Sequence, residues 1–98
     1  MRDGNIRARH FVQDASGKYL WEGTHFLAND TTYANLPERI PNLKEGDIVY
    51  VFDFYLRRQR SPYTGEVKWL RMPPADPEVR GLWTMARQAE NAAASPSS

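Results

Sequence analysis

The sequence predicts a small α+β domain, with an antiparallel sheet of about four strands arranged as two hairpins and one C-terminal helix packed on it. Three observations predict this class. Strand-length segments of alternating or apolar residues occupy the chain as far as residue 72, turn residues join them in pairs, and a helical pattern with a capping aspartate follows. A chain of 98 residues suits one domain, which we expect over residues 1–94, with a disordered tail over 95–98.

The first hairpin is expected over residues 5–27. Residues 5–13 alternate between apolar and polar side chains, which predicts a strand with one face exposed to water. Residues 14–18 supply a turn, because aspartate, serine and glycine favour tight turns. The return strand, residues 19–27, contains Gly23, and a glycine within a strand often marks a bulge or a bend.

A connection and a central strand come next. Residues 28–46 break the strand pattern, and Pro37 and Pro41 exclude a long helix, so we expect a connection that lies against the core. Residues 48–56 form the strongest strand, with apolar side chains on both faces, which predicts a central strand covered on two sides. Asp53 would lie in the middle of this strand and would need a partner, which a nearby arginine can supply.

The second hairpin follows directly. The strand continues through residues 57–60, and residues 61–65 have the chemistry of a type I turn followed by a glycine bulge. We therefore expect Arg58 and Arg60 at an exposed turn. The return strand, residues 66–72, alternates in character and ends at two prolines.

The C-terminal helix is expected to begin at Asp76 and Pro77 and to reach about Ala93, because aspartate accepts hydrogen bonds from free amides and proline tolerates the first helical position. Gly81 weakens this helix by about 1 kcal/mol relative to alanine. We expect Trp83 to pack on the sheet and offset that loss. An open sheet under the helix is the favoured architecture, and a partly closed barrel is the alternative.

Composition sets limits on the class of protein. Without cysteine, disulfides and thiolate metal ligands are excluded, and a reducing, cytoplasmic compartment is the expectation. No apolar run approaches the roughly 20 residues of a membrane span, and the first residues resemble no signal peptide, so no membrane partner and no removed leader are expected. No motif indicates a cofactor.

Positive charge is concentrated in the second hairpin. From residue 57 to residue 71 five basic side chains stand against one acid, a local charge of +4 in a chain whose total is +1, so the remainder carries −3. Guanidinium groups pair with phosphates, and an exposed ring can stack on a base. A solvated hairpin end that prevents edge-to-edge aggregation needs charge as well, so a surface without a ligand is the simpler alternative. The candidate binding residues are Arg57, Arg58, Arg60, Tyr63 and Lys68, with Arg71 as a further candidate and with Arg7 and Arg9 if the first strand lies near this hairpin.

The remaining polar residues give no signature of a metal or catalytic site. His10 and His25 are the only histidines, so a zinc site would need carboxylates such as Glu22 or Asp30 brought close by the fold. We expect a locally hydrogen-bonded histidine instead of a metal ligand. No serine stands in a recognisable nucleophile motif, so we expect no enzyme; a cleft lined by His25, Asp53 and an arginine would favour catalysis.

Two turn motifs flank the central part of the chain. Gly46-Asp47 stands before the apolar strand, and Tyr63-Thr64-Gly65 stands after it. This arrangement resembles the corresponding hairpin of ASCH and PUA-type RNA-binding barrels. The resemblance covers less than a third of the chain and consists of turn residues that many β-proteins share, so we assign no family from it.

These observations favour a non-enzymatic binding module whose basic second hairpin contacts an anionic partner, nucleic acid first. The alternative is a protein-interaction or regulatory module, such as an inhibitor, that binds an acidic protein surface with the same hairpin. A pull-down with and without nuclease separates the two, because only bridging through nucleic acid disappears on digestion. The sequence leaves the oligomeric state, and the choice between DNA and RNA, open.

Overall fold

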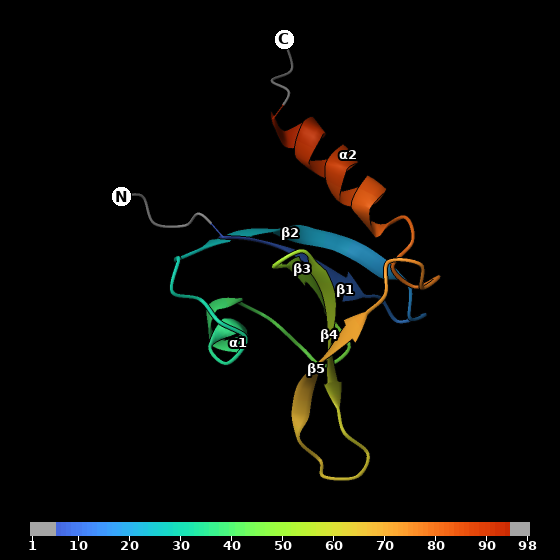
Figure 1. Cartoon of the computed structure of the whole chain (residues 1–98). Helices are drawn as coiled ribbons and strands as arrows, with labels where there is room; N and C mark the ends of the chain where they lie inside the picture. The colour runs from blue at the N-terminus through green and yellow to red at the C-terminus, as the bar shows by residue number, and fades with distance from the viewer. Residues whose placement is uncertain (1–5, 95–98) are drawn as a thin grey trace.

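The computed structural model describes residues 6–94, so the expected tail over 95–98 lies outside the described residues. The seven elements, in chain order, are β1 (Ile6–Gln13), β2 (Tyr19–Leu27), α1 (Leu36–Arg39), β3 (Ile48–Val51), β4 (Phe54–Arg60), β5 (Val67–Met72) and α2 (Leu82–Ala94). The strands form one antiparallel sheet in the order β2-β1-β3-β4-β5 (Figure 1). The α+β class with a C-terminal helix is therefore confirmed, and the sheet stays open rather than closing into a barrel, because β2 and β5 lie at opposite ends of it.

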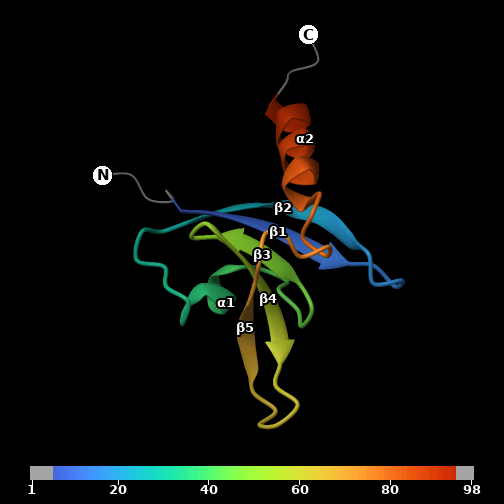
Figure 2. The same ribbon diagram turned by 45° about the vertical axis from the view of Figure 1, so that its right-hand side comes forward.

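Both faces of the sheet are covered, by different segments. Figures 1 and 2 place α2 on one side of the β1–β2 hairpin and α1 on the other. On the α2 side the buried cluster consists of Phe11, Tyr19, Ile48, Tyr55, Met72, Val79, Leu82 and Ala86. On the α1 side it consists of Ala8, Leu27, Leu36, Ile40, Val49, Val51 and Leu56. The connection before β3 thus lies against the core, as expected. Leu36, at the start of α1, and Ile40, directly after it, are its buried side chains.

The wet face expected on β1 is found only near the ends of the strand, where Arg7 and Gln13 are exposed, because the middle of the strand is buried on both faces. Phe11 is fully buried under α2, and Arg9 on the same face is only 9% exposed. The alternation of polar residues in the sequence does not reveal that a distant helix covers this side. The bulge expected at Gly23 is confirmed: the register shifts between His10, which pairs with Gly23, and Phe11, which pairs with Trp21.

The expected central strand over residues 48–56 is two strands. Phe52 and Asp53 both have positive φ, 54° and 67°, and they form the tight turn between β3 and β4. Positive φ at both central residues is the geometry of a type I′ turn, which matches the twist of a hairpin. The sheet therefore has five strands, and Asp53 is exposed in a turn instead of buried in mid-strand.

The C-terminal helix begins later than expected. Asp76 does form a turn, since its carboxylate accepts from the amide of Glu78 and its carbonyl accepts from that of Val79, but Gly81 then takes a φ of 86° and separates this turn from α2. The side chain of Leu82 is buried as expected, and Trp83 contacts Tyr50 and Arg9 of the sheet as expected, although its side chain stays 40% exposed. Within residues 6–94, neither helix is long and apolar enough to cross a membrane.

Candidate nucleic-acid interface

The structure places the candidate binding residues on two opposite faces of the sheet. Residues directly opposite each other in antiparallel strands point to the same side. Arg57 pairs with Ile48, which belongs to the α2-side cluster, whereas its neighbour Arg58 must point to the α1 side. The candidates on the α2 side are Arg7, Arg9, Arg57 and Lys68, and those on the α1 side are Arg58, Arg60 and Arg71. Arg58 and Arg60 lie within β4 and not at a turn.

Three of the candidate arginines are paired with acids. Arg57 is hydrogen-bonded to Glu78, from the turn before α2. Arg60 donates to the carboxylate of Glu45 at 2.9 Å and to a backbone carbonyl in its own hairpin. These pairs hold the hairpin against neighbouring loops, so part of the charge that the sequence shows is neutralised within the fold.

Arg9 makes the most enclosed of these pairs. Its Nε donates to Glu90 of α2 at 3.1 Å, and Thr24 of β2 donates to the same carboxylate. Although burial opposes the change, the hydrogen bond from Thr24 and the guanidinium of Arg9 lower the pKa of Glu90. Arg9 therefore links β1 to α2, and its charge is paired with Glu90.

Two arginines on the α1 side have no acidic partner among residues 6–94. The guanidinium carbon of Arg58 lies 4.9 Å from the ring centre of Trp69, and that of Arg71 lies 4.6 Å from the ring centre of Phe54. Burial lowers the pKa of Arg58, because its charge is partly removed from water with no anion nearby. We call Phe54, Arg58, Trp69 and Arg71 the arginine–aromatic strip.

The strip follows from alternation along β4 and β5. Arg58 pairs directly with Trp69, while Trp69 and Arg71 are two residues apart on β5 and so share a face. The indole of Trp69 donates to the carbonyl of Tyr33 at 3.3 Å, which ties the strip to the connection after β2. The arginines are visible in the sequence, but the pairing of β4 with β5 places Arg58 over Trp69 and brings Arg71 beside Phe54.

Tyr63 stands at the tip of the same hairpin and is 94% exposed. Gly65 takes a φ of 77° and donates to the carbonyl of Ser61, whose hydroxyl accepts from the amides of Tyr63 and Thr64. Figures 1 and 2 show this loop at the end of the molecule opposite α2. The loop therefore presents an uncovered ring beyond the strip.

Of the other candidates, Lys68 makes only a long, exposed contact of 3.9 Å with Glu66, and Arg7 is exposed.

The histidines form a buried hydrogen-bonded chain that the sequence does not reveal. Asp47 accepts from the backbone amide of Lys44 at 3.0 Å and lies 2.8 Å from Nε2 of His10, which is fully buried. Because the carboxylate acts as an acceptor, His10 donates from Nε2, and its Nδ1 lies 3.3 Å from Nε2 of His25. Burial first, and then His10, lower the pKa of His25. Asp47 could have been suspected from the sequence only as a turn residue.

Within the described part of the chain no group of three or more His, Cys, Asp or Glu side chains could hold a metal ion. Asp53 and His25 lie on different hairpins, and the hollows that Asp53 lines do not include His25. A hydrogen-bonded strand histidine was expected, and His10 is one, but its partners are the distant residues Asp47 and His25 instead of local ones.

No family model, curated protein or solved structure matches this chain.

Proposed function

We propose that this protein binds single-stranded nucleic acid through the arginine–aromatic strip, with Tyr63 as an additional stacking ring. The observation that carries the proposal is the pair of guanidinium groups, Arg58 and Arg71, that rest on rings and lack an acidic partner among residues 6–94. A phosphate beside Arg58 would offset the cost of its partial burial.

The strip suits single strands better than a duplex. Single-strand binders combine backbone-neutralising cations with rings on which bases stack, and stacking contributes about 1–3 kcal/mol per base. Duplex readout relies on a helix or ribbon in a groove and on many phosphate contacts. A chain of net charge +1, with Arg57 and Arg60 paired internally, offers few such contacts.

The test is fluorescence anisotropy of labelled single-stranded DNA, single-stranded RNA and duplex DNA at low salt. We expect the single strands to bind more tightly than the duplex. In the variant Arg58→Gln/Arg71→Gln, affinity for single strands should fall at least 10-fold, and the salt slope should drop by about 0.7 for each phosphate that the variant no longer neutralises. Tyr63→Ala should weaken binding without changing that slope, because it removes stacking and no charge.

The control variant Lys18→Gln/Arg80→Gln removes the same charge from exposed positions outside the strip. It should bind nearly as well as the wild-type protein. The proposal is wrong if no probe binds below about 100 μM, the weak end of non-specific affinity, or if the control variant binds as weakly as the strip variant. The acidic-protein alternative would then take its place, and a pull-down whose partner survives nuclease would support it.

A further inference from the structure

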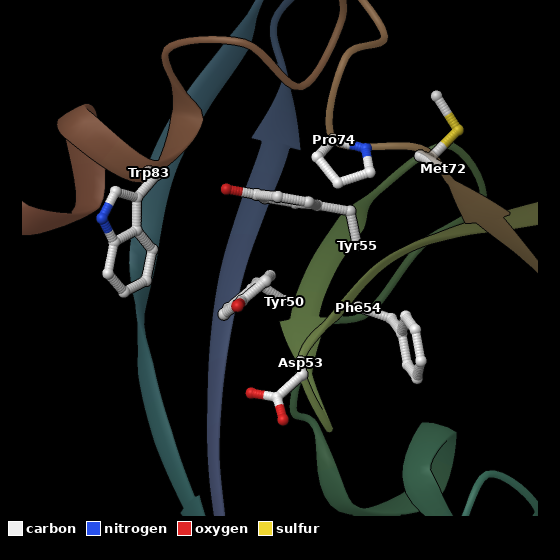
Figure 3. A pocket seen from close by; sticks show the side chains of 7 residues that line it. All are labelled: Tyr50, Asp53, Phe54, Tyr55, Met72, Pro74 and Trp83. Atoms are coloured by element: carbon white, nitrogen blue, oxygen red, sulfur yellow. The ribbon is translucent and has the colours of Figure 1, made fainter.

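A hollow of about 280 Å³ opens on the other side of the sheet, between α2 and the β3–β4 hairpin. Its walls are aromatic (Figure 3). The ring centres of Tyr50 and Tyr55 lie 4.6 Å apart, and those of Tyr50 and Trp83 lie 5.4 Å apart. Pro74 and Met72 line the end of the hollow beside Tyr55. Because neighbouring rings are tilted by 49° and 61°, the apolar wall of the hollow is uneven and not flat.

Three hydrogen-bond donors on these rings have no partner among residues 6–94: the hydroxyls of Tyr50 and Tyr55 and the indole N–H of Trp83. Tyr55 is the informative one, because the residue is only 8% exposed. Its hydroxyl points toward Trp83 across the hollow in Figure 3. Burial raises the pKa of Tyr55, so the group stays a neutral donor. The hydroxyl is not a buried atom, since Arg57 Nε is the one buried and unpartnered side-chain atom of the described residues, so it is free to donate to a group that enters the hollow.

The rim of the hollow carries one unpaired acid. Asp53 sits in the type I′ turn, is exposed, and makes no hydrogen bond or ion pair with any described residue. Its carboxylate lies below Tyr50 in Figure 3, at the end opposite Pro74. A ligand that fills the hollow would therefore meet apolar rings and three donors along its length, and a negative charge at one end.

This combination selects the class of ligand. The hollow is smaller than the roughly 300–1,000 Å³ of pockets for drug-sized molecules. An organic cation caged by the rings is disfavoured, since Arg9 and Arg87 already lie 4.8 and 5.9 Å from the ring centre of Trp83. A polyproline II segment presents free carbonyls, because it has no internal hydrogen bonds, and apolar rings that fit between aromatic side chains.

We propose that this hollow docks a proline-rich segment of a partner protein, with a basic residue of that segment held by Asp53. Proline rings pack on the open side of the contacting rings of Trp83, Tyr50 and Tyr55, and backbone carbonyls of the segment accept from the donors on these rings. The hollow shares Phe54 with the arginine–aromatic strip, but Tyr50, Tyr55 and Trp83 do not belong to the strip, and peptide docking on them does not depend on nucleic-acid binding.

The test uses ¹H–¹⁵N NMR of the full chain titrated with synthetic ten-residue peptides. The probe peptide contains two prolines in a P-x-x-P spacing and one arginine near an end. A second peptide replaces both prolines by alanine, and a third replaces arginine by glutamine. We expect the indole N–H resonance of Trp83 to shift with the first peptide and hardly with the second. The third should bind several-fold more weakly than the first.

Two conservative variants keep the fold and probe the contacts separately. Tyr55→Phe retains the ring and should weaken the first peptide about 2- to 10-fold, the effect of one neutral hydrogen bond. Asp53→Asn suits the same turn, since asparagine also adopts positive φ, and it should abolish the difference between the first and third peptides. Tyr63→Phe, at the far hairpin, is the matched control and should bind like the wild-type protein.

The proposal is overturned if about 1 mM of the first peptide leaves the Trp83 resonance unmoved, or if the alanine peptide binds equally well. Equal binding by Tyr55→Phe would also overturn it. So would a shift of the Trp83 resonance by single-stranded nucleic acid and not by peptide. If the arginine–aromatic strip binds no nucleic acid, the peptide should still shift the Trp83 resonance. The two proposals can therefore fail separately.

Discussion

Removal of the Asp47 carboxylate should be among the most damaging single changes that leave the apolar core intact. In Asp47→Ala, the Nε2–H of His10 and the amide of Lys44 lose their acceptor. His10 is fully buried and Asp47 is 3% exposed, so water does not readily replace the carboxylate. The two donors would be left unsatisfied inside the fold.

The magnitude follows from those two bonds. A buried donor left unpaired costs about 1–3 kcal/mol, and hydrogen bonds to a charged group lie at the upper end. Relief of the buried charge of Asp47 offsets part of the sum. We therefore expect a loss of about 3 kcal/mol in the free energy of unfolding, a large part of the roughly 5–15 kcal/mol typical of a domain. Asp47→Asn keeps an acceptor oxygen and should lose only about 1 kcal/mol.

Urea unfolding followed by circular dichroism measures both losses. With a slope of about 1–3 kcal/mol/M, Asp47→Ala should lower the midpoint by about 1–3 M while the slope stays constant. His10→Leu completes a double-mutant cycle, and its coupling with Asp47→Ala should exceed about 1 kcal/mol. A loss below about 1 kcal/mol for Asp47→Ala, or no coupling to His10, would refute the reasoning, because the pair would then be no more than a surface contact.

The remaining predictions concern Trp83 and His25. Trp83→Ala should destabilise the protein by less than about 2 kcal/mol, since the side chain is 40% exposed. Phe11→Ala, at a fully buried position, should cost about 3–5 kcal/mol. If urea melts show the larger loss for Trp83→Ala, the described packing of α2 on the sheet is wrong. The pKa of His25 is lowered in the fold by burial and by His10, so the unfolded chain binds more protons around pH 6, and stability should be full above about pH 6.5 and fall as the pH drops through it. His25→Gln should flatten that fall between about pH 5 and 7, and an unchanged slope would contradict the assignment.

The sequence predicts the elements of this fold better than their ends, for a local reason. The pattern from Ile48 to Leu56 alternates without interruption, yet Phe52 and Asp53 turn the chain through left-handed backbone. Asparagine or glycine at these positions would have signalled a hairpin, but phenylalanine signals a strand. At Gly81 the reverse holds: a residue that looks like a weak point within a helix in fact separates a capped turn from the helix.

The candidate site was predictable only as a set of residues, since charge counting along the chain does not record which way a strand residue points. Arg57 and Arg58 are neighbours in sequence, but one is fastened to Glu78 on the α2 side and the other rests on Trp69 on the α1 side. The basic residues behind the local charge of +4 therefore divide between arginines paired with acids of other segments and the arginine–aromatic strip. Whether an arginine is paired with an acid or belongs to the strip depends on strand register and on the positions of acids from other segments. A one-residue register shift between β4 and β5 would turn Trp69 to the other face of the sheet, away from Arg58, so the pairing of Arg58 with Trp69 is what the nucleic-acid proposal depends on.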